Sequence, residues 1–322
     1  MSEEWLDLDV TEIRQLTSAI KEFVLRAPER NPLPAFSAGA HLRFMLPGGS
    51  DALERCYSLI NAAEDTSTYR IAVHHAAQSK GGSSFMCEQV VVGTRLRTRA
   101  PKNDFPLSPN SKHHILLAGG IGITPIFSMA KALTAAHQSF ELHYVARTPE
   151  SMAYRDEIVA AFHGHVTVYS DQGDPALGMP LQRILADPKN STHVYVCGPR
   201  PMIDSVLATA QQQRWSTDSI HFELFAPPVA LSGDHAIEVI LARSRQTIHV
   251  PSDKSILDTL IAHGHDLMYD CQRGECGICA VAVLEGVPEH RDYALSEGQK
   301  LDNRTMCICV SRAKTRTLVL DI

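Results

Sequence analysis

The chain has 322 residues, a length that predicts two or three domains rather than one ordinary core. Its apolar content of 44%, charged content of 20% and formal net charge of -6 are typical of a soluble globular protein and argue against a nucleic-acid binder. The acidic start predicts no signal peptide, and no run approaches the ~18 apolar residues of a membrane span, so we expect a cytoplasmic protein.

The segment from residue 8 to about 104 predicts short strands separated by turns. Strand-like patterns are found, for example, at residues 21–25, 41–46 and 69–74. Several such strands at short intervals predict an antiparallel β-barrel. The proline-rich segment 100–106 is a candidate linker after it.

Two short motifs in this first segment suit a phosphate. In Arg55-Cys56-Tyr57-Ser58, Arg55 can fork onto a phosphate while Tyr57 and Ser58 meet a flavin, or the tetrad is ordinary strand sequence. Gly81-Gly82-Ser83-Ser84 is either a flexible turn or a phosphate-binding nest that opens a helix. Each motif is weak alone, and the pair gains weight from the nucleotide-type segment that follows.

Between about residue 110 and 226, apolar strands alternate with helical patterns, which predicts a parallel sheet. One strand leads into Gly119-Gly120-Ile121-Gly122-Ile123-Thr124-Pro125, and another ends in Cys197-Gly198-Pro199; a helical pattern follows each. Two glycine turns at the carboxyl ends of parallel strands predict a crevice for a pyrophosphate and nicotinamide. Cys197 is either a buried thiol or a residue over the nicotinamide.

The last segment contains five of the eight cysteines. Cys271, Cys276 and Cys279 have the Cys-x4-Cys-x2-Cys spacing of the plant-type ferredoxin loop, which holds a [2Fe–2S] cluster. Gly274 and Gly277 suit the sharp bends around such a cluster. A structural zinc site usually needs two close cysteine pairs, and disulfides need an oxidising compartment, so we favour the cluster.

The fourth ligand of the cluster is either Cys307 or Cys309. Residues two apart on a strand share a face, so strand geometry does not choose between them. The surrounding strand patterns, together with a helical pattern at 255–263 that stops at Gly264, predict a small α+β unit.

With all of these motifs in order, the chain resembles the phthalate dioxygenase reductase family, which includes vanillate demethylase and carnitine monooxygenase reductases. The resemblance covers essentially the whole chain. Its anchors are Arg55-x-Tyr57-Ser58, Gly81-Gly82-Ser83, the Gly119 loop, Cys197-Gly198-Pro199, His221-Phe222-Glu223-Leu224-Phe225, the cysteine loop, His290-Arg291-Asp292 and Cys309-Val310-Ser311-Arg312-Ala313-Lys314. We expect an FMN-binding β-barrel (1–104), an NAD-binding α/β domain (105–226), a linker (227–235) and an α+β plant-type ferredoxin domain with the [2Fe–2S] cluster (236–322).

The resemblance implies roles for individual residues. The flavin-binding positions are Arg55, Cys56, Tyr57, Ser58, Ala72, Val73, His74, Gly81, Gly82, Ser83 and Thr124. The positions around the nicotinamide dinucleotide are Gly119, Gly120, Gly122, Thr124, Pro125, Asp171, Gly198 and Pro199. Phe225 would stack on the flavin. The candidate catalytic residues are Thr124, Cys197 and Phe225. Two positions depart from the family pattern, since Cys56 stands where threonine is common and His74 where lysine is common.

The resemblance also implies the cofactors. Relatives with a C-terminal ferredoxin domain look like FMN proteins, so we expect FMN, with FAD as the alternative. By the same comparison, Asp171 faces the adenosine ribose and favours NADH over NADPH. The alternative is that Asp171 only begins a surface turn. The family ending aligns Cys309 with the fourth cluster ligand.

The function implied is that of a monomeric reductase, which passes electrons from NADH through FMN and the cluster to a terminal Rieske-type oxygenase. A flavin suits this task because it accepts two electrons together and releases them singly. We expect the oxygenase to dock near Gln272, Arg273 and Glu275. Alternatives are a reductase that serves a cytochrome P450 and a redox sensor without turnover.

Overall fold

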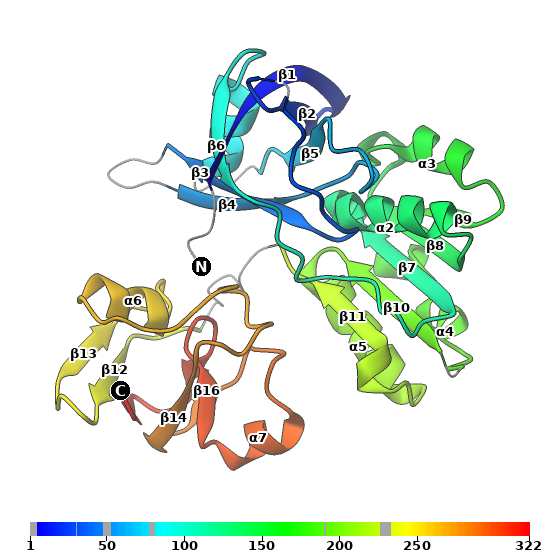
Figure 1. The fold of residues 1–322 in the computed structure, drawn as a ribbon. Helices are drawn as coiled ribbons and strands as arrows, with labels where there is room; N and C mark the ends of the chain where they lie inside the picture. Colours follow the sequence, from blue (N-terminus) through cyan, green and yellow to red (C-terminus); the bar gives the residue numbers. More distant parts are fainter. Residues whose placement is uncertain (1–4, 30, 48–52, 77–80, 190, 226–232) are drawn as a thin grey trace. The chain divides into compact units, whose positions relative to one another are not determined.

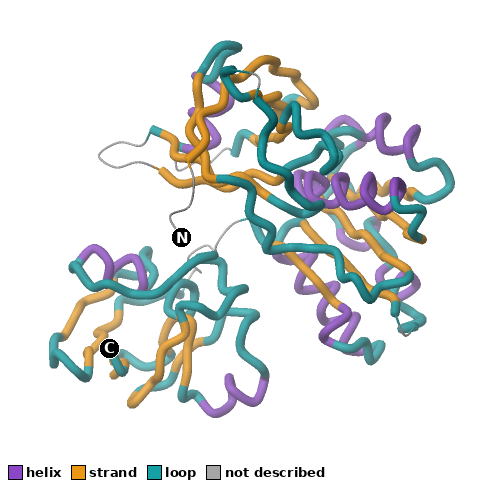
Figure 2. The backbone as a smooth tube through the Cα atoms, in the orientation of Figure 1, coloured by secondary structure: helices purple, strands orange, loops and turns teal. Residues whose placement is uncertain are grey.

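The computed structural model describes residues 5–29, 31–47, 53–76, 81–189, 191–225 and 233–322. The chain forms two compact units, Met1–Glu223 and Leu224–Ile322. Most of the expected linker at 227–235 lies outside the described residues. The longest helices belong to the middle of the chain, whereas the N-terminal and C-terminal parts consist mainly of strands and loops (Figure 2). No described helix is both long enough and apolar enough to cross a membrane.

The first unit begins with a six-stranded antiparallel sheet in the order β4-β3-β6-β1-β2-β5 (Figure 1). The strands are β1 (Trp5–Thr17), β2 (Ile20–Arg26), β3 (His41–Leu46), β4 (Leu53–Ser58), β5 (Tyr69–His74) and β6 (Arg95–Arg99). Alternate residues Leu42, Phe44 and Leu46 of β3 are buried, as a strand with one face on a core requires. Just beyond β4, the Ile60 N–H donates to Arg70 O at 2.9 Å, which joins the two edge strands and closes the barrel.

A five-stranded parallel sheet follows in the order β11-β10-β7-β8-β9. Its strands are β7 (His113–Gly119), β8 (Ser139–Ala146), β9 (Val166–Ser170), β10 (Thr192–Cys197) and β11 (Ile220–Glu223). The main helices are α2 (Ile123–Ala135), α3 (Arg155–Ala161), α4 (Leu181–Ile184) and α5 (Arg200–Gln212). Helix α2 packs on β7, β8 and β10, and α5 packs on β10 and β11 (Figure 1). The predicted parallel sheet is confirmed.

The barrel and the parallel sheet share one hydrophobic core. Ile60 and Ala72 of the barrel belong to the same buried cluster as Phe127 of α2 and Tyr154 before α3. The candidate linker 100–106 is held by backbone hydrogen bonds in both directions between Lys102 and His41, at 2.8 and 3.1 Å. The first two expected domains therefore pack as one compact unit rather than as two bodies on a loose connection.

The second unit is a small α+β fold with strand order β13-β12-β18-β14-β16. Its elements are β12 (Ile237–Leu241), β13 (Thr247–Val250), α6 (Ile256–Ala262), β14 (Ala280–Glu285), α7 (Glu297–Asp302), β16 (Thr305–Cys307) and β18 (Thr317–Leu320), with β15 (Pro288–Glu289) paired to β17 (Arg312–Ala313). Ser255 caps α6 by accepting the Asp258 N–H, and Gly264 follows the helix with a φ of +85°. This architecture confirms the predicted α+β unit.

Candidate functional site

The three clustered cysteines lie in the loop between α6 and β14. The loop bends through left-handed conformations at Gly274 and Gly277, with φ values of 81° and 73°. A Cβ at Gly274 would lie 2.7 Å from Val310 Cγ2 and 3.1 Å from Asp292 Cα. Glycine is therefore required at 274 by the dihedral angle and by space. The tight fit brings the cysteine loop against the segment that contains Cys309.

The thiols of the second unit lie close to one another. Cys279 Sγ is 3.0 Å from Cys309 Sγ, and Cys276 is hydrogen-bonded to Cys271. The neighbouring thiols of Cys307 and Cys309 lower the pKa of Cys279, which favours the thiolate form that a metal ligand needs. Within the described parts of the chain, no three His, Cys, Asp or Glu side chains surround a point suited to a single metal ion. The close thiols on a glycine-bent loop instead suit a cluster held by thiolates.

The structure separates Cys307 from Cys309. Strand β16 ends at Cys307, and a turn follows in which Cys307 O accepts hydrogen bonds from Val310 N and Ser311 N. The assumption that both cysteines lie on one strand face is therefore wrong. Cys309 lies beside Cys279 and accepts a hydrogen bond from the Gly274 N–H. Cys309 remains the proposed fourth ligand because it meets the cysteine loop at two points.

A buried polar network supports the cysteine loop. The carboxylate of Asp292 accepts hydrogen bonds from Ser311 Oγ at 3.1 Å and from Leu295 N at 2.9 Å. Next to it, the Tyr293 N–H donates to Gly274 O at 2.9 Å. Asp292 thus holds the turn after Cys309, while its neighbour holds the bend of the cysteine loop.

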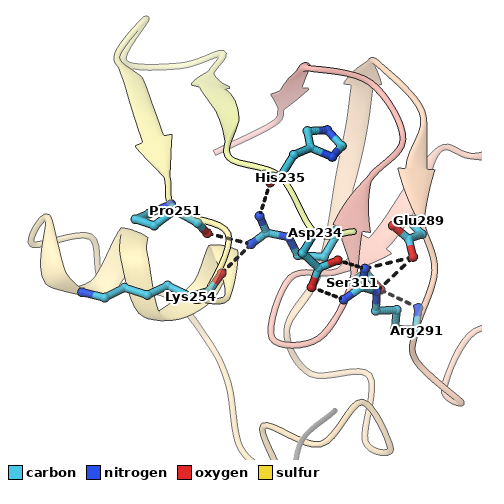
Figure 3. A network of polar contacts seen from close by, with 8 residues as sticks. Asp234, His235, Pro251, Lys254, Glu289, Arg291 and Ser311 are labelled. Atoms are coloured by element: carbon cyan, nitrogen blue, oxygen red, sulfur yellow. Dashed lines mark hydrogen bonds and ion pairs between the residues drawn. The ribbon is translucent and has the colours of Figure 1, made fainter. Parts of the chain in front are cut away.

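Two arginines extend this network to the residues that enter the unit (Figure 3). Arg291 forms a two-pronged ion pair with Asp234 and a second ion pair with Glu289, and its backbone N–H donates to Ser311 Oγ at 3.2 Å. These contacts raise the pKa of Arg291, most of all the hydrogen bonds that its guanidinium donates to Asp234. The buried Arg312 guanidinium donates to three backbone carbonyls, those of His235, Pro251 and Lys254. The start of the second unit is therefore fixed to the segment around the proposed fourth ligand.

The two charged residues expected at a docking face, Arg273 and Glu275, have largely buried side chains. Arg273 Nε lies 2.9 Å from Glu275 Oε2, and the two side chains are only 12% and 16% exposed. Glu275 Oε1 accepts a hydrogen bond from Leu224 N at 2.6 Å. Of the three residues expected to meet a partner, Gln272 is the exposed one. Arg273 and Glu275 therefore pair with each other within the loop, and docking of a partner near them stays a prediction.

The proposed flavin motifs meet in the barrel. Arg55 and Tyr57 are partly buried on one face of β4, whereas Cys56 is exposed on the other. A Cβ on Gly82 would lie 2.7 Å from Arg55 Cγ, so the turn that begins with Gly81 packs directly on the arginine. The structure thus brings the tetrad and the glycine-serine turn together, but it points Cys56 away from Arg55.

The remaining predicted flavin positions lie on β4, on β5 and in the turn that begins with Gly81. Ser58 ends β4 and is buried, as are Ala72 and Val73 on β5. His74 is exposed at the end of β5. Partial desolvation of its ring, followed by the charge of His75, lowers its pKa. Ser83 Oγ accepts the Ala76 N–H at 3.4 Å, which ties the turn to the chain just beyond β5. Cys56 and His74, the two positions that depart from the family pattern, are both exposed.

The two glycine turns of the parallel sheet touch each other. Strands β7 and β10 are neighbours, with Ala118 opposite Cys197. A Cβ on Gly122 would lie 2.1 Å from Cys197 O, and one on Gly119 would lie 2.8 Å from Pro199 Cδ. Only glycine permits this approach. The structure therefore joins the two turns at the carboxyl ends of adjacent strands, where a doubly wound sheet binds a dinucleotide.

Three other predicted residues have local partners. Thr124 is buried and its Oγ1 donates to Ile121 O at 3.0 Å, which closes the first turn of the Gly119 loop. Cys197 is also buried, as expected for a thiol at the end of a strand. Asp171 follows β9, and its Oδ1 accepts the Gly173 N–H at 2.9 Å. Roles for these side chains toward a cofactor remain predictions.

Sequence patterns did not reveal the supporting residues. Asp292, Ser311 and Arg291 lie in motifs that we noticed, but nothing in the spacing showed that they bond to one another. Leu224 and Glu275 are 51 residues apart, and their contact joins a backbone N–H to a side chain. Such contacts have no sequence period and depend on the folded arrangement.

Known proteins match this chain over its whole length. Residues 239–314 match the family described as 2Fe-2S iron-sulfur cluster binding domain, and residues 94–220 match the dimethylamine monooxygenase subunit DmmA-like N-terminal domain. The carnitine monooxygenase reductase subunit of Acinetobacter baumannii is 40% identical over 97% of this chain and 96% of its own length.

Two solved structures are also similar to this chain over nearly all of its length. The structure of phthalate dioxygenase reductase, described as modular for electron transfer from pyridine nucleotides to [2Fe-2S], is 34% identical with a TM-score of 0.77 and covers 99% of this chain and 98% of its own. A type IV self-sufficient cytochrome P450 monooxygenase is 34% identical with a TM-score of 0.71, over 99% of this chain and 41% of its own. At this identity over nearly the full length of both chains, this chain belongs to the phthalate dioxygenase reductase family.

Proposed function

We propose that this chain is the NADH-dependent reductase component of an oxygenase system, with a terminal Rieske-type oxygenase as its electron acceptor. The observation that carries the proposal is the presence, in one chain, of two touching glycine turns at Gly119 and Cys197 and of a cysteine loop bent at Gly274. A nucleotide crevice and a thiolate loop are the two ends of an electron relay from a pyridine nucleotide to iron.

The barrel suits a flavin monophosphate between these ends. Arg55 and the turn at Gly81, Gly82 and Ser83 would hold the phosphate, since Gly82 packs directly on the Arg55 side chain. Bound FMN would accept two electrons from NADH and release them singly. No general acid or base is required of the chain, so its task is to orient and shield the cofactors.

The chain's own residues define the remaining roles. Gly119, Gly122 and Gly198 let the two turns pack together at the edge where the dinucleotide would bind, and Asp171 would favour NADH. Phe225 would stack on the flavin and yield to nicotinamide, as the family resemblance implies. Cys271, Cys276, Cys279 and Cys309 would hold the cluster. A monomer in the cytoplasm, where the thiols stay reduced, completes the proposal.

Anaerobic addition of NADH to the purified protein tests the proposal. We expect the flavin and then the cluster absorbance to bleach, extraction to yield FMN rather than FAD, and cytochrome c to be reduced over many turnovers. A redox sensor would show no such turnover. Reconstitution with candidate Rieske-type oxygenases, and with a cytochrome P450, then compares NADH-coupled product formation. Failure of NADH to bleach the flavin would refute the proposed function.

A further inference from the structure

Helix α2 contacts both proposed cofactor segments. It begins directly after the Gly119–Gly122 turn and lies where the barrel meets the parallel sheet (Figure 1). Two of its side chains reach the barrel backbone. Ser128 Oγ donates to Asn61 O at 3.3 Å, and Lys131 Nζ donates to Ile60 O at 2.9 Å. These carbonyls belong to the chain just after β4, the strand of the flavin tetrad.

The receiving segment is rigidly connected to both flavin strands. The Ile60 N–H donates to Arg70 O at 2.9 Å, and the Arg70 N–H donates to Asn61 Oδ1 at 3.0 Å. Asn61 Nδ2 in turn donates to Thr68 O at 3.0 Å. Ile60 and Asn61 therefore join the exit of β4 to the start of β5. A displacement of this joint would move both strands that are proposed to hold the flavin.

The environment of Lys131 indicates a role in placement. Its ammonium lies 3.8 Å from the centroid of the Phe127 ring, and burial lowers its pKa to about 8. A desolvated cation is a weak source of stability, because an apolar side chain of similar size often serves a buried site equally well. The ammonium instead adds a directional hydrogen bond to the Ile60 carbonyl. This bond fixes the register of helix α2 against the segment that follows β4.

A second polar contact crosses the same boundary. Glu22 of β2 is 2% exposed, and its Oε1 accepts the Tyr154 hydroxyl at 2.9 Å, just before α3. Arg70 Nε donates to the same oxygen at 2.8 Å, and Arg14 Nε donates to Oε2 at 3.0 Å. Glu22 thus fixes β5 and α3 together through Arg70 and Tyr154. The boundary is therefore held at more than one point, and we expect a change at Lys131 alone to leave the unit folded.

We propose that Lys131 and Ser128 are positioning residues for hydride transfer: they hold the exit of the flavin strand at a set distance from the glycine turn at the start of α2. This inference rests on the proposed function. Ile123 and Lys131 are eight residues apart, so one rigid helical segment of about 12 Å links the two sites. In the step concerned, the hydrogen at C4 of bound NADH would be transferred with its bonding electron pair to the bound flavin, which would give NAD+ and the two-electron-reduced flavin.

This step depends steeply on distance. Reacting atoms must approach to about 3–3.5 Å, and a displacement of about 1 Å can cost about a hundredfold in rate. Loss of the Lys131 bond is therefore expected to slow flavin reduction more than it affects folding, flavin content or the cluster.

The test compares Lys131→Met and Ser128→Ala with Lys189→Met, a matched control because the Lys189 side chain is 72% exposed in the same unit. Stopped-flow reduction of the flavin by saturating NADH is followed without oxygen. We expect Lys131→Met to slow reduction by about 10- to 100-fold and Ser128→Ala by about 3- to 10-fold, with the control unchanged. We also expect a larger isotope effect with C4-deuterated NADH, which a purely structural role would not cause.

A Lys131→Met rate within twofold of the control would overturn the proposal, as would slow reduction that higher NADH concentrations restore. If Lys131→Met loses its flavin, Ser128→Ala decides by the same two criteria. The wild-type reaction separates the two hypotheses. A wild-type protein that NADH does not bleach refutes the proposed function, whereas normal bleaching with unaffected variants refutes only the roles of Lys131 and Ser128.

Discussion

The carboxylate oxygen Oε1 of Glu275 lies 2.6 Å from the backbone nitrogen of Leu224, so a residue inside the cysteine loop is hydrogen-bonded to the residue that precedes Phe225. The other oxygen of the same carboxylate lies 2.9 Å from Arg273 Nε. One side chain therefore satisfies a charge within the loop and a backbone N–H at the start of the second unit.

Removal of this carboxylate is expected to weaken the cysteine loop. A hydrogen bond to a charged group contributes about 1.5–3 kcal/mol, so Glu275→Ala should lose its cluster faster on mild heating. Glu275→Gln keeps an oxygen for the Leu224 N–H and should fall between Glu275→Ala and wild type. The measurement is the decay of the cluster's visible absorbance, with Glu297→Ala as an exposed control. Equal decay in Glu275→Ala and Glu275→Gln would mean that the pair with Arg273, not the bond to Leu224, matters.

The choice of fourth ligand has a direct test. Cys309→Ser is expected to change or lose the cluster spectrum, because Cys309 lies 3.0 Å from Cys279 and meets Gly274. Cys307→Ser is expected to keep the spectrum, since Cys307 ends a strand paired with β14. Iron and sulfide content and the electron paramagnetic resonance of the reduced protein measure both. The reverse pattern would assign Cys307 as the ligand.

Asp171 is expected to set the preference for NADH. Asp171→Asn keeps the acceptor for the Gly173 N–H but removes the negative charge that would repel a 2′-phosphate. We expect kcat/KM for NADPH to rise about tenfold, or roughly 1.4 kcal/mol, with little change for NADH. Asp174→Asn is the matched control, because Asp174 accepts the Ala176 N–H at 2.9 Å in the same turn. If both variants behave alike, Asp171 only shapes the turn.

The histidine pair at the start of β10 and β11 predicts a dependence of stability on pH. His193 Nδ1 lies 2.8 Å from His221 Nε2, and burial, followed by the charge of His193, lowers the pKa of His221 to about 4. An unfolded histidine binds its proton near pH 6.5. Between pH 6.5 and 4 the unfolded chain thus binds more protons, so stability falls as the pH decreases, by on the order of 1–3 kcal/mol.

The measurement is the melting temperature at pH 7 and pH 5. His221→Phe retains a ring against Tyr195, whose ring centroid lies 4.7 Å away, but cannot take up a proton. We expect it to lose fewer degrees than wild type between the two pH values. His163→Phe, at an exposed position, should behave as wild type does. An equal loss in His221→Phe would show that other groups cause the pH dependence.

Much of the architecture follows from local sequence. The apolar run before Gly119 and the alternation in β3 predicted a parallel and an antiparallel sheet, because strand burial has a short period that a sequence displays directly. The cysteine loop was equally clear, since three of the four proposed cluster ligands lie within nine residues of one another. The same locality explains why Ser255 and Gly264 predicted the ends of α6.

Side-chain direction and long-range contacts were decided only by the tertiary structure. Sequence spacing placed Arg273 and Glu275 beside the cluster but could not show that they turn inward, and it placed Cys307 and Cys309 on one strand that in fact ends between them. The bond from Lys131 to Ile60 spans 71 residues, and that from Arg291 to Asp234 spans 57. A donor and an acceptor so far apart meet only when separate elements pack, so no local pattern in the sequence records their contact.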